Sequence, residues 1–205
     1  MTERTGQARA ARTRNRLVLS AAAEFASRGY DGTSFARVCR EAAVTMGALT
    51  FHFPTKASLA QAVGAAGIEA THSAVDDADA RAATPLASVG GIAQTLAELL
   101  GGQALVRAAA RLAREHPALE VDWRSSWLPL VRTRLYQAHV LDQLRPGTQP
   151  ETAALLVGSL VAGLEVGLLP HPARRPRTAQ QQLAEQWRTA LVGIGPDHDH
   201  PAEAS

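Results

Sequence analysis

The stretch TMGALTFHFPTK, residues 45–56, decides how this chain folds. Hydroxyl, imidazole and ammonium side chains are interspersed here with three apparent anchors, Leu49, Phe51 and Phe53, and the run closes on a proline followed by a threonine. A proline and a threonine in this order are typical of a boundary between two helices. A helix buried on all sides does not need so many polar tips, and a solvated helix does not need two phenylalanines. The pattern predicts a short helix that is packed on one side and open on the other.

Helical spacing continues on both sides of this run. Upstream, Leu17 and Phe25 lie on one helical face, and Thr33 or Ser34 can cap the helix that follows. The helices expected in this part of the chain cover residues 15–29, 34–42, 45–51 and 56–79. Residues 1–12 are basic and poor in apolar side chains, so we expect a disordered arm there. Three short helices that lead into a long fourth one are the outline of a helix-turn-helix module.

The rest of the chain also has a helical pattern. Aromatic residues make up only 4% of the 205 residues, so the core must be built mainly from Ala, Leu and Val, which favours helices over sheets. Beyond residue 80, prolines and glycines separate segments of about 10–20 residues, and no alternating strand pattern appears. We therefore expect an all-α protein. Its expected parts are a helix-turn-helix domain with a basic arm over 1–55, a larger helical domain over 56–195 and a disordered tail over 196–205.

Charge and cysteine content limit which partners the protein can have and in which compartment it works. Residues 1–60 carry nine Lys or Arg against four Asp or Glu, whereas the remainder carries twelve against fifteen, which indicates that only the N-terminal part meets a polyanion. Cys39 is the single cysteine, so a reducing compartment fits. The basic N-terminus has no apolar core of a secretory signal behind it. The apolar stretch 153–169 is interrupted by Glu165 and three glycines, so we expect no membrane span. The sequence predicts a soluble, cytoplasmic protein.

A helix-turn-helix places the start of its second helix in the major groove of DNA, while helix ends contact phosphates. Gly47 would let the backbone approach DNA closely, and Thr45 offers a hydroxyl and a methyl group to a base edge. Leu49 and Phe53 would point inward and hold the short helix. The expected contacts with double-stranded DNA are Arg14, Thr33, Ser34, Thr45, Met46, Gly47, Ala48, Thr50, His52 and Lys56. On spacing alone, the pattern fits equally well a helix followed by a capped turn with no role in DNA binding.

Residues 29–63, GYDGTSFARVCREAAVTMGALTFHFPTKASLAQAV, resemble the DNA-binding signature of TetR-type transcriptional regulators. The resemblance implies a homodimeric repressor with a three-helix DNA-binding domain and a helical body for ligand binding and dimerisation. A finer resemblance, in TRNRLVLSAAAEFASRGYDGTS and GALTFHF, is to the γ-butyrolactone autoregulator receptor branch. That branch implies release from operator DNA by a small lipophilic signalling molecule.

Two positions depart from the family pattern. Members commonly carry Lys where this chain has Met46 and Tyr where it has Thr50, and both side chains usually contact phosphates. Their loss predicts weaker non-specific DNA affinity and a salt dependence that is flatter by about one counterion. The arginines of the arm could offset this loss by following the DNA backbone or a minor groove. They are Arg9, Arg12, Arg14 and Arg16.

The body carries the expected effector site. Trp127 follows Trp123 at i+4, with Leu130 and Val131 on the same face, and the resemblance implies that Trp127 forms a wall of a ligand cavity. Both tryptophans also fit the role of ordinary core residues. The expected contacts with a small-molecule effector are Leu99, Trp123, Trp127, Leu130, Val131 and Val161.

The body also carries the expected dimer contact. Three glycines, at 158, 163 and 167, would let a second helix approach the helix over 153–169 closely. A final helix over 177–193, with Leu183, Trp187 and Leu191, would complete a four-helix seam between two subunits. Burial of the 153–169 helix within one subunit fits its apolar character equally well. Dimerisation is favoured because two DNA half-sites require two-fold symmetry.

The sequence gives no sign of an enzyme. It has no Gly-rich phosphate loop, nucleophile elbow or His-x-x-x-His pair, and nothing arranges His116, Asp122 and Ser125 as a triad. His198 and His200 in the tail fit solvated residues better than metal ligands, so neither a metal nor a cofactor is expected. The primary hypothesis is a ligand-responsive transcriptional repressor. The alternative is a regulator that responds to an antibiotic or a biosynthetic intermediate, or one without a ligand.

Overall fold

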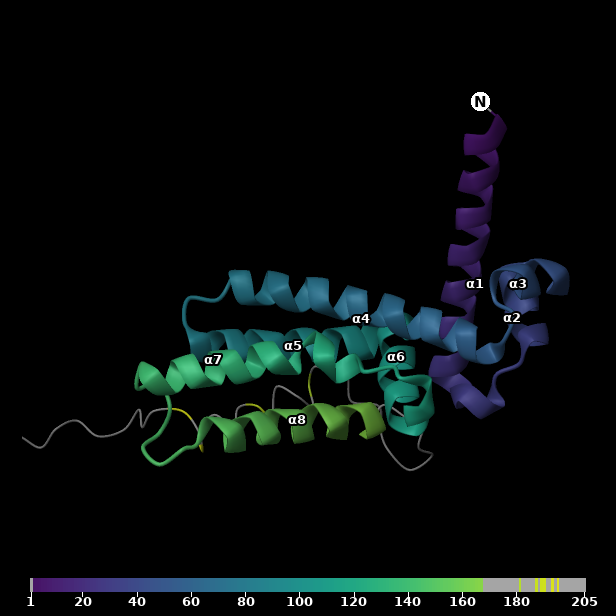
Figure 1. Cartoon of the computed structure of the whole chain (residues 1–205). Coiled ribbons are helices and arrows are strands. Elements are labelled where there is room, and N and C mark those ends of the chain that lie inside the picture. The colour runs from purple at the N-terminus through teal and green to yellow at the C-terminus, as the bar shows by residue number, and fades with distance from the viewer. Residues whose placement is uncertain are drawn as a thin grey trace, which may run out of the picture. The chain divides into compact units, whose positions relative to one another are not determined.

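The computed structural model describes residues 2–167 and, beyond them, residues 181, 187, 189, 190, 193 and 195. Over 2–167 the chain forms α-helices and two short 3-10 helices, and this range contains no strand, which confirms the all-α prediction (Figure 1). The α-helices are α1 (Thr2–Gly32), α2 (Phe35–Ala42), α3 (Met46–His52), α4 (Lys56–Ala80), α5 (Pro85–Gly102), α6 (Ala104–Glu115), α7 (Leu128–Val140) and α8 (Pro150–Gly167). The 3-10 helices are η1 (Pro117–Leu119) and η2 (Trp123–Ser126).

Packing groups these elements into two compact units. The first unit contains Met1–Thr71 and Gly102–Ser126, and the second contains His72–Gly101 and Trp127–Ser205. Helix α4 is continuous through Thr71 and His72, so it belongs to both units. The functional boundary expected between residues 55 and 56 stays a prediction.

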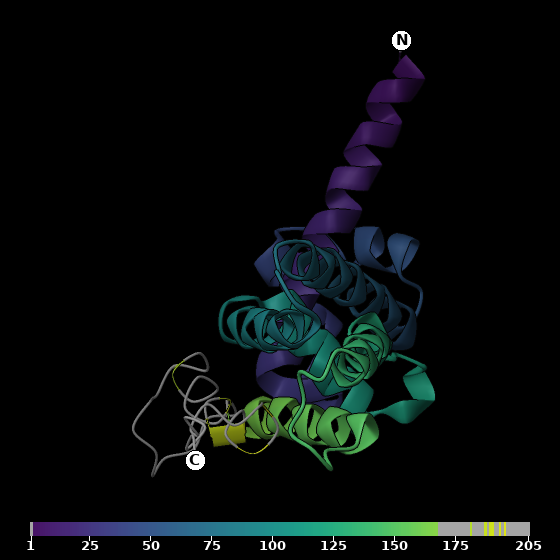
Figure 2. The same cartoon turned by 90° about the vertical axis from the view of Figure 1, so that its left-hand side faces the viewer.

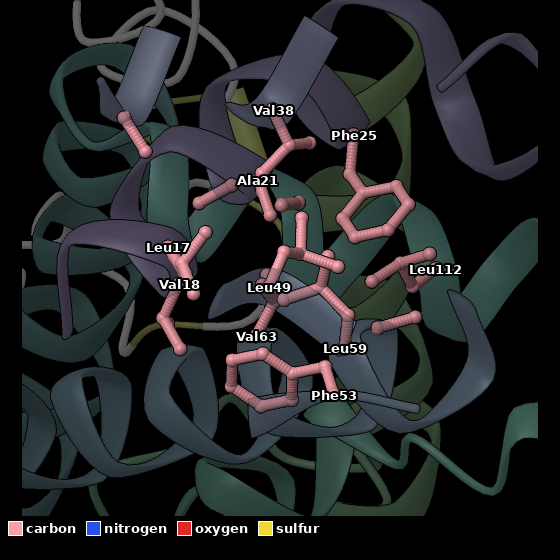
Figure 3. Close-up of a cluster of buried hydrophobic side chains, with 14 of the residues drawn as sticks. Leu17, Val18, Ala21, Phe25, Val38, Leu49, Phe53, Leu59, Val63 and Leu112 are labelled. Atoms are coloured by element: carbon pink, nitrogen blue, oxygen red, sulfur yellow. The ribbon is translucent and has the colours of Figure 1, made fainter. Parts of the chain in front are cut away.

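The core of the first unit gathers apolar residues from α1, α2, α3, α4 and α6 (Figure 3). Leu17 and Phe25 from α1, Leu49 from α3 and Leu59 from α4 have no exposed surface, and each such side chain stabilises the fold by roughly 1.5–3 kcal/mol. Leu112 of α6 is 1% exposed in the same cluster. Sequence periodicity predicted the faces of α1 and α3, whereas it gave no indication that α6 joins them.

Helix α3 shows which of the three apparent anchors hold it. Leu49 and Phe53 are 0% and 2% exposed, which confirms that they point inward, but Phe51 is 80% exposed and the prediction that it is an anchor is wrong. Two residues along an α-helix correspond to a rotation of about 200°. Because Leu49 faces the core, Phe51 faces the opposite way.

Helix α1 is longer than the sequence suggested. It begins at Thr2, so both the start expected at residue 15 and the disordered arm over 1–12 are wrong for this structure. Its N-terminal part extends beyond α2 and α3 (Figures 1 and 2). The Ala/Arg-rich composition of that part has high helix propensity, and a helix already nucleated on the core adds further turns at little cost.

Gly29 interrupts α1 near its C-terminal end. Its φ of 71° and ψ of −178° lie in a region that residues with a side chain rarely adopt. A Cβ atom at this position would lie 2.8 Å from both Arg111 Nη2 and Glu115 Oε2, which are the ends of flexible side chains that can move, so it is the positive φ that favours glycine here. This agrees with the prediction that the first long helical run stops around Gly29.

The second unit contains the end of α4 together with α5, α7 and α8. Here the expected i+4 pairing of two tryptophans on one helix is wrong. Trp123 lies in η2, and Trp127 is the N-cap residue of α7, with a non-helical φ of −146°. Pro129, next to the start of α7, favours the first turn of a new helix over the continuation of an old one.

No helix among the described residues has the length and apolar character that crossing a membrane requires, and this includes α8, which contains most of the apolar stretch 153–169. The helix expected over 177–193 lies mostly outside the described residues. The tail over 196–205, with His198 and His200, lies entirely outside them.

Candidate functional site

The turn before α3 is fixed by backbone and side-chain hydrogen bonds. Ala43 adopts the left-handed conformation with φ 49°, its N–H donates to Arg40 O at 3.2 Å, and Val44 N donates to Cys39 O at 3.0 Å. Thr45 is the N-cap of α3, and its hydroxyl oxygen accepts a hydrogen bond from Ala48 N at 3.2 Å. Together with the buried anchors, these bonds hold α3 in one orientation.

The outward face of α3 is uncharged. Phe51 is 80% exposed and Met46 is 45% exposed, and a Cβ atom at Gly47 would meet nothing within 4 Å. Thr50 is exposed as well, and its hydroxyl donates to Met46 O at 3.1 Å and to Gly47 O at 3.2 Å. The ring of half-buried His52 lies edge-on to the Phe51 ring, with 5.3 Å between centroids. This face offers shape and apolar contact more than hydrogen bonds.

Two cations are positioned near the C-terminal end of α3. Lys56 Nζ lies 4.6 Å from the centroid of the Tyr30 ring and donates to Asp31 O at 3.4 Å. The Arg14 guanidinium carbon lies 5.0 Å from the centroid of the Phe53 ring. Cation–π contacts of this kind contribute about 0.5–1 kcal/mol at exposed sites, which favours one region of space for each charge without immobilising it.

Thr33 and Ser34 have different environments. Ser34 is the exposed N-cap of α2, and its side chain makes no capping hydrogen bond. Thr33 is only 3% exposed, and its hydroxyl donates to Gly29 O at 2.8 Å. Thr33 therefore closes the turn after α1, and Ser34 is the member of the pair that faces solvent.

Helix α6 supports this region from within the first unit. Arg111 Nη1 donates to Ala26 O at 3.1 Å, and Arg111 Nε is paired with Glu115 at 2.8 Å. After α6, the His116 ring lies 4.7 Å from the Tyr30 ring, centroid to centroid. Sequence analysis missed this support because residues 111–116 are far from residues 26–30 along the chain. The four-residue spacing of Ala108 and Leu112 was the available signal, and it marks a packed face without naming the partner.

Cys39 contributes packing and no reactive group. It is 8% exposed, in the core behind α2, and burial raises the pKa of its thiol above the usual value. A thiol with a raised pKa stays protonated near neutral pH. Cys39 therefore packs as a small apolar residue of this core.

The module formed by the end of α1, α2, α3 and the start of α4 coincides with a known domain. Residues 17–63 match the family model described as bacterial regulatory proteins, tetR family. This module is therefore similar to the N-terminal part of tetR-family regulatory proteins.

Similarity to known proteins extends over most of the length of the chain. It is 28% identical over 195 residues to the A-factor receptor protein of Streptomyces griseus, an alignment that covers 92% of this chain and 66% of that protein. The chain thus spans slightly less than two thirds of the length of this relative.

Solved structures extend the similarity to the whole fold. CprB from Streptomyces coelicolor A3(2) superposes with a TM-score of 0.77 at 28% identity, covering 93% of this chain and 92% of CprB. CprB in complex with its biological operator sequence gives 0.74 at 29% identity, covering 92% and 90%. A γ-butyrolactone receptor described as an ArpA-like protein gives 0.72 at 27% identity, covering 92% and 90%. The resemblance of this chain to the γ-butyrolactone receptor branch is confirmed.

The expected effector contacts fall in both units of this chain. Leu99, Trp127, Val131 and Val161 are buried and Leu130 is half-buried in the second unit. Trp123 is in the first unit, where its indole N–H donates to Thr71 Oγ1 at 2.9 Å, and the Thr71 hydroxyl donates to Gly67 O at 2.7 Å. The role of these residues in ligand binding stays a prediction.

Proposed function

We propose that the chain is a homodimeric repressor that binds operator DNA through α3 and is released by a small lipophilic molecule such as a γ-butyrolactone, a butenolide or a furan. The observation that carries the proposal is the division of α3 into two sides. Leu49 and Phe53 lock one side into the core, while Met46, Gly47, Thr50 and Phe51 lie open on the other. A rigid helix with an uncommitted face at this position of a TetR-family module suits insertion into a major groove. Such a repressor acts in the cytoplasm, where its operator lies.

Polar and charged side chains around α3 would position the module on the DNA backbone. Lys56, Arg14, His52 and Ser34 are suited to phosphate contacts, which give affinity without sequence information. Arg9, Arg12 and Arg16 are exposed on α1 and share one face of its N-terminal part. These three arginines are the groups that would offset the phosphate contacts missing at Met46 and Thr50.

A matched pair of substitutions tests the role of α3. Thr50 and Thr133 are both exposed helical threonines, and each hydroxyl donates to the carbonyl oxygen four residues earlier, at 3.1 Å and 3.0 Å. Glutamate at position 50 would face DNA phosphates, so Thr50→Glu should weaken operator binding at least tenfold in fluorescence anisotropy, by loss of about 1.4 kcal/mol or more. Thr133→Glu, on α7, should bind like the wild type.

The DNA for this test is the sequence upstream of the chain's own gene, titrated at low salt and again at higher salt. Binding of the wild type should weaken with salt because counterions are released from phosphates. Absence of binding to any operator sequence at low salt would contradict the proposed function. Equal loss in the two glutamate variants would contradict the role of α3.

The dimer is proposed on the basis of α8. Its residues opposite the buried side form a line with no charged member, and they are Thr152, Leu155, Ser159, Gly163 and Val166. Leu155 and Val166 are 66% and 56% exposed, while Ser159 uses its hydroxyl to donate to Leu155 O at 2.9 Å. Cβ atoms at Gly158 and Gly163 would meet nothing within 4 Å. A second copy of the chain is the occupant that suits this face, because two half-sites call for two-fold symmetry.

The effector is proposed to bind among apolar residues of the second unit, with Trp127 as the aromatic wall. To change the ratio of the DNA-binding conformation to the released conformation from 99:1 to 1:99, the effector must bind the released conformation more tightly by about 5.5 kcal/mol. Helix α4 is the candidate lever because it is continuous from Lys56 to Ala80 and so belongs to both units.

Trp127→Ala should abolish effector-induced release and leave operator binding intact in the anisotropy assay. Tyr136→Ala, at a 64% exposed aromatic position of α7, is the control and should respond normally. If the effector released Trp127→Ala from the operator at the concentration that releases the wild type, the assignment of Trp127 to the effector site would be refuted. Quenching of tryptophan fluorescence is then measured with lactones, furans and antibiotics. Quenching by lactones or furans indicates an autoregulator receptor. Quenching by antibiotics or biosynthetic intermediates, or by none of the compounds, indicates the alternative regulator.

A further inference from the structure

Phe51 has no role in the fold of the first unit. Phe25 and Phe53 are 0% and 2% exposed in its core, whereas Phe51 on α3 is 80% exposed, which is more than any other large apolar side chain of the described residues. Among the described residues, the Phe51 ring has one aromatic neighbour, the His52 ring, with 5.3 Å between the two centroids. An exposed phenyl ring on the helix proposed to enter the major groove calls for a contact made only in the complex.

The composition of α3 limits what that contact recognises. Hydrogen-bonded readout of guanine relies on Arg or Lys, of adenine on Asn or Gln, and of cytosine on Asp or Glu. None of these residue types occurs between Met46 and His52. The Thr50 hydroxyl donates to backbone oxygens of its own helix, and the Thr45 hydroxyl oxygen accepts from Ala48 N. The helix is therefore poor in groups that discriminate bases by hydrogen bonds.

One group in the major groove is recognised by apolar contact alone, namely the C5-methyl of thymine. Phe51 lies one helical turn after Gly47 on the same side of α3, and no side chain at Gly47 competes for the space there. We infer that Phe51 reads thymine in the operator through its methyl group and is the main determinant of base specificity on α3. This inference rests on the proposed DNA-binding function. It requires thymine in each half-site at the position that faces Phe51.

Deoxyuridine tests this requirement, because it differs from thymidine only in lacking the methyl group and keeps every hydrogen-bonding edge. The wild-type protein first selects its tightest duplexes from a random library, and each half-site thymine is then replaced singly by deoxyuridine. At the position that faces Phe51, loss of one buried methyl should weaken binding about fourfold. Replacement at thymines outside the contacted positions should leave affinity unchanged.

Substitutions assign the effect to Phe51. Phe51→Ala should bind the thymine and deoxyuridine duplexes equally, whereas Phe51→Leu keeps apolar bulk and should retain preference for thymine. Leu19→Ala removes an apolar side chain that is 51% exposed on α1, and this control should discriminate like the wild type. If Phe51→Ala binds too weakly to measure, Phe51→Leu and Phe51→Asn are compared instead. Phe51→Leu should prefer thymine over deoxyuridine, and Phe51→Asn should bind both duplexes equally.

Three results have distinct meanings. Equal wild-type affinity for all deoxyuridine and thymine duplexes overturns methyl readout. Undiminished preference for thymine in Phe51→Ala overturns the assignment to Phe51. Both results leave DNA binding itself in place, whereas failure to enrich any duplex at low salt overturns the proposed function instead.

Discussion

Asp79 joins three helices of the second unit through one carboxylate. Arg134 of α7 donates to it from Nε at 2.6 Å and from Nη2 at 2.5 Å, and Ser88 of α5 donates from Oγ at 2.5 Å. The hydrogen bonds from Arg134, followed by that from Ser88 and the positive charge of Arg134, hold the pKa of Asp79 below its usual value despite partial burial. The end of α4 is thereby attached to the elements that carry the expected effector contacts.

Asp79→Asn should lower the free energy of unfolding by about 1–2 kcal/mol at pH 7. This is the contribution of hydrogen bonds to a charged group, reduced because the group is partly exposed. The folded-state pKa lies below the unfolded value of about 4, so this stabilisation is present above that value and is lost as the pH falls through the folded pKa. The difference between wild type and variant in urea denaturation should therefore narrow below pH of about 4. Asp76→Asn, at an exposed residue paired with His72, is the control and should have little effect at pH 7. A difference that does not change with pH would contradict this account.

At the scale of elements, Gly29 interrupts the helical conformation of α1 near its C-terminal end. Gly29→Ala places a side chain at φ 71° and puts its Cβ 2.8 Å from Arg111 and Glu115. Backbone strain in this region costs about 1–3 kcal/mol, so we expect a loss of stability of that size in thermal or urea denaturation. Gly47→Ala adds a methyl group in open space within α3 and should instead leave stability unchanged or raise it by up to about 1 kcal/mol. Equal effects of the two substitutions would show that Gly29 is not under strain.

Local signals made much of the helix-turn-helix predictable. The turn before α3 and the inward positions of Leu49 and Phe53 follow from spacing and capping, which act over a few residues. The same signals failed for Phe51, because a run of apolar residues does not state which of them faces the core until the helix register is known. They also left open whether Thr33 or Ser34 precedes α2, since both residue types suit an N-cap and only the packed structure shows that Thr33 is buried and Ser34 is the N-cap.

Non-local packing accounts for what the sequence could not supply. The interaction between α6 and α1 depends on segments more than 80 residues apart, as the bond from Arg111 to Ala26 O shows. The link from Asp79 to Arg134 has the same character, because its ends are 55 positions apart in the sequence. The full length of α1 was missed because residues 2–14 lack an apolar face, and their helix is stabilised by attachment to a packed one.

At the scale of the whole molecule, the proposed function requires two copies of α3 at a fixed separation. Helix α8 presents the uncharged face proposed to join them, and Leu155, 66% exposed, lies on it. Leu155→Glu would place a carboxylate in a desolvated interface opposite its symmetry-related copy, where like charges repel. The variant should elute as a monomer in light-scattering chromatography at concentrations where the wild type is a dimer.

The same substitution links assembly to DNA binding. A monomer contacts one half-site, so Leu155→Glu should lose at least a hundredfold in operator affinity, by removal of about 2.7 kcal/mol or more of binding free energy. Its far-ultraviolet circular dichroism and its thermal transition should resemble those of the wild type, because Leu155 contributes little to the core of its own subunit. Leu19→Glu, a matched exposed leucine on α1, should remain dimeric. A Leu155→Glu protein that stays dimeric would exclude α8 as the interface, and a monomer with unchanged operator affinity would exclude symmetric recognition of two half-sites.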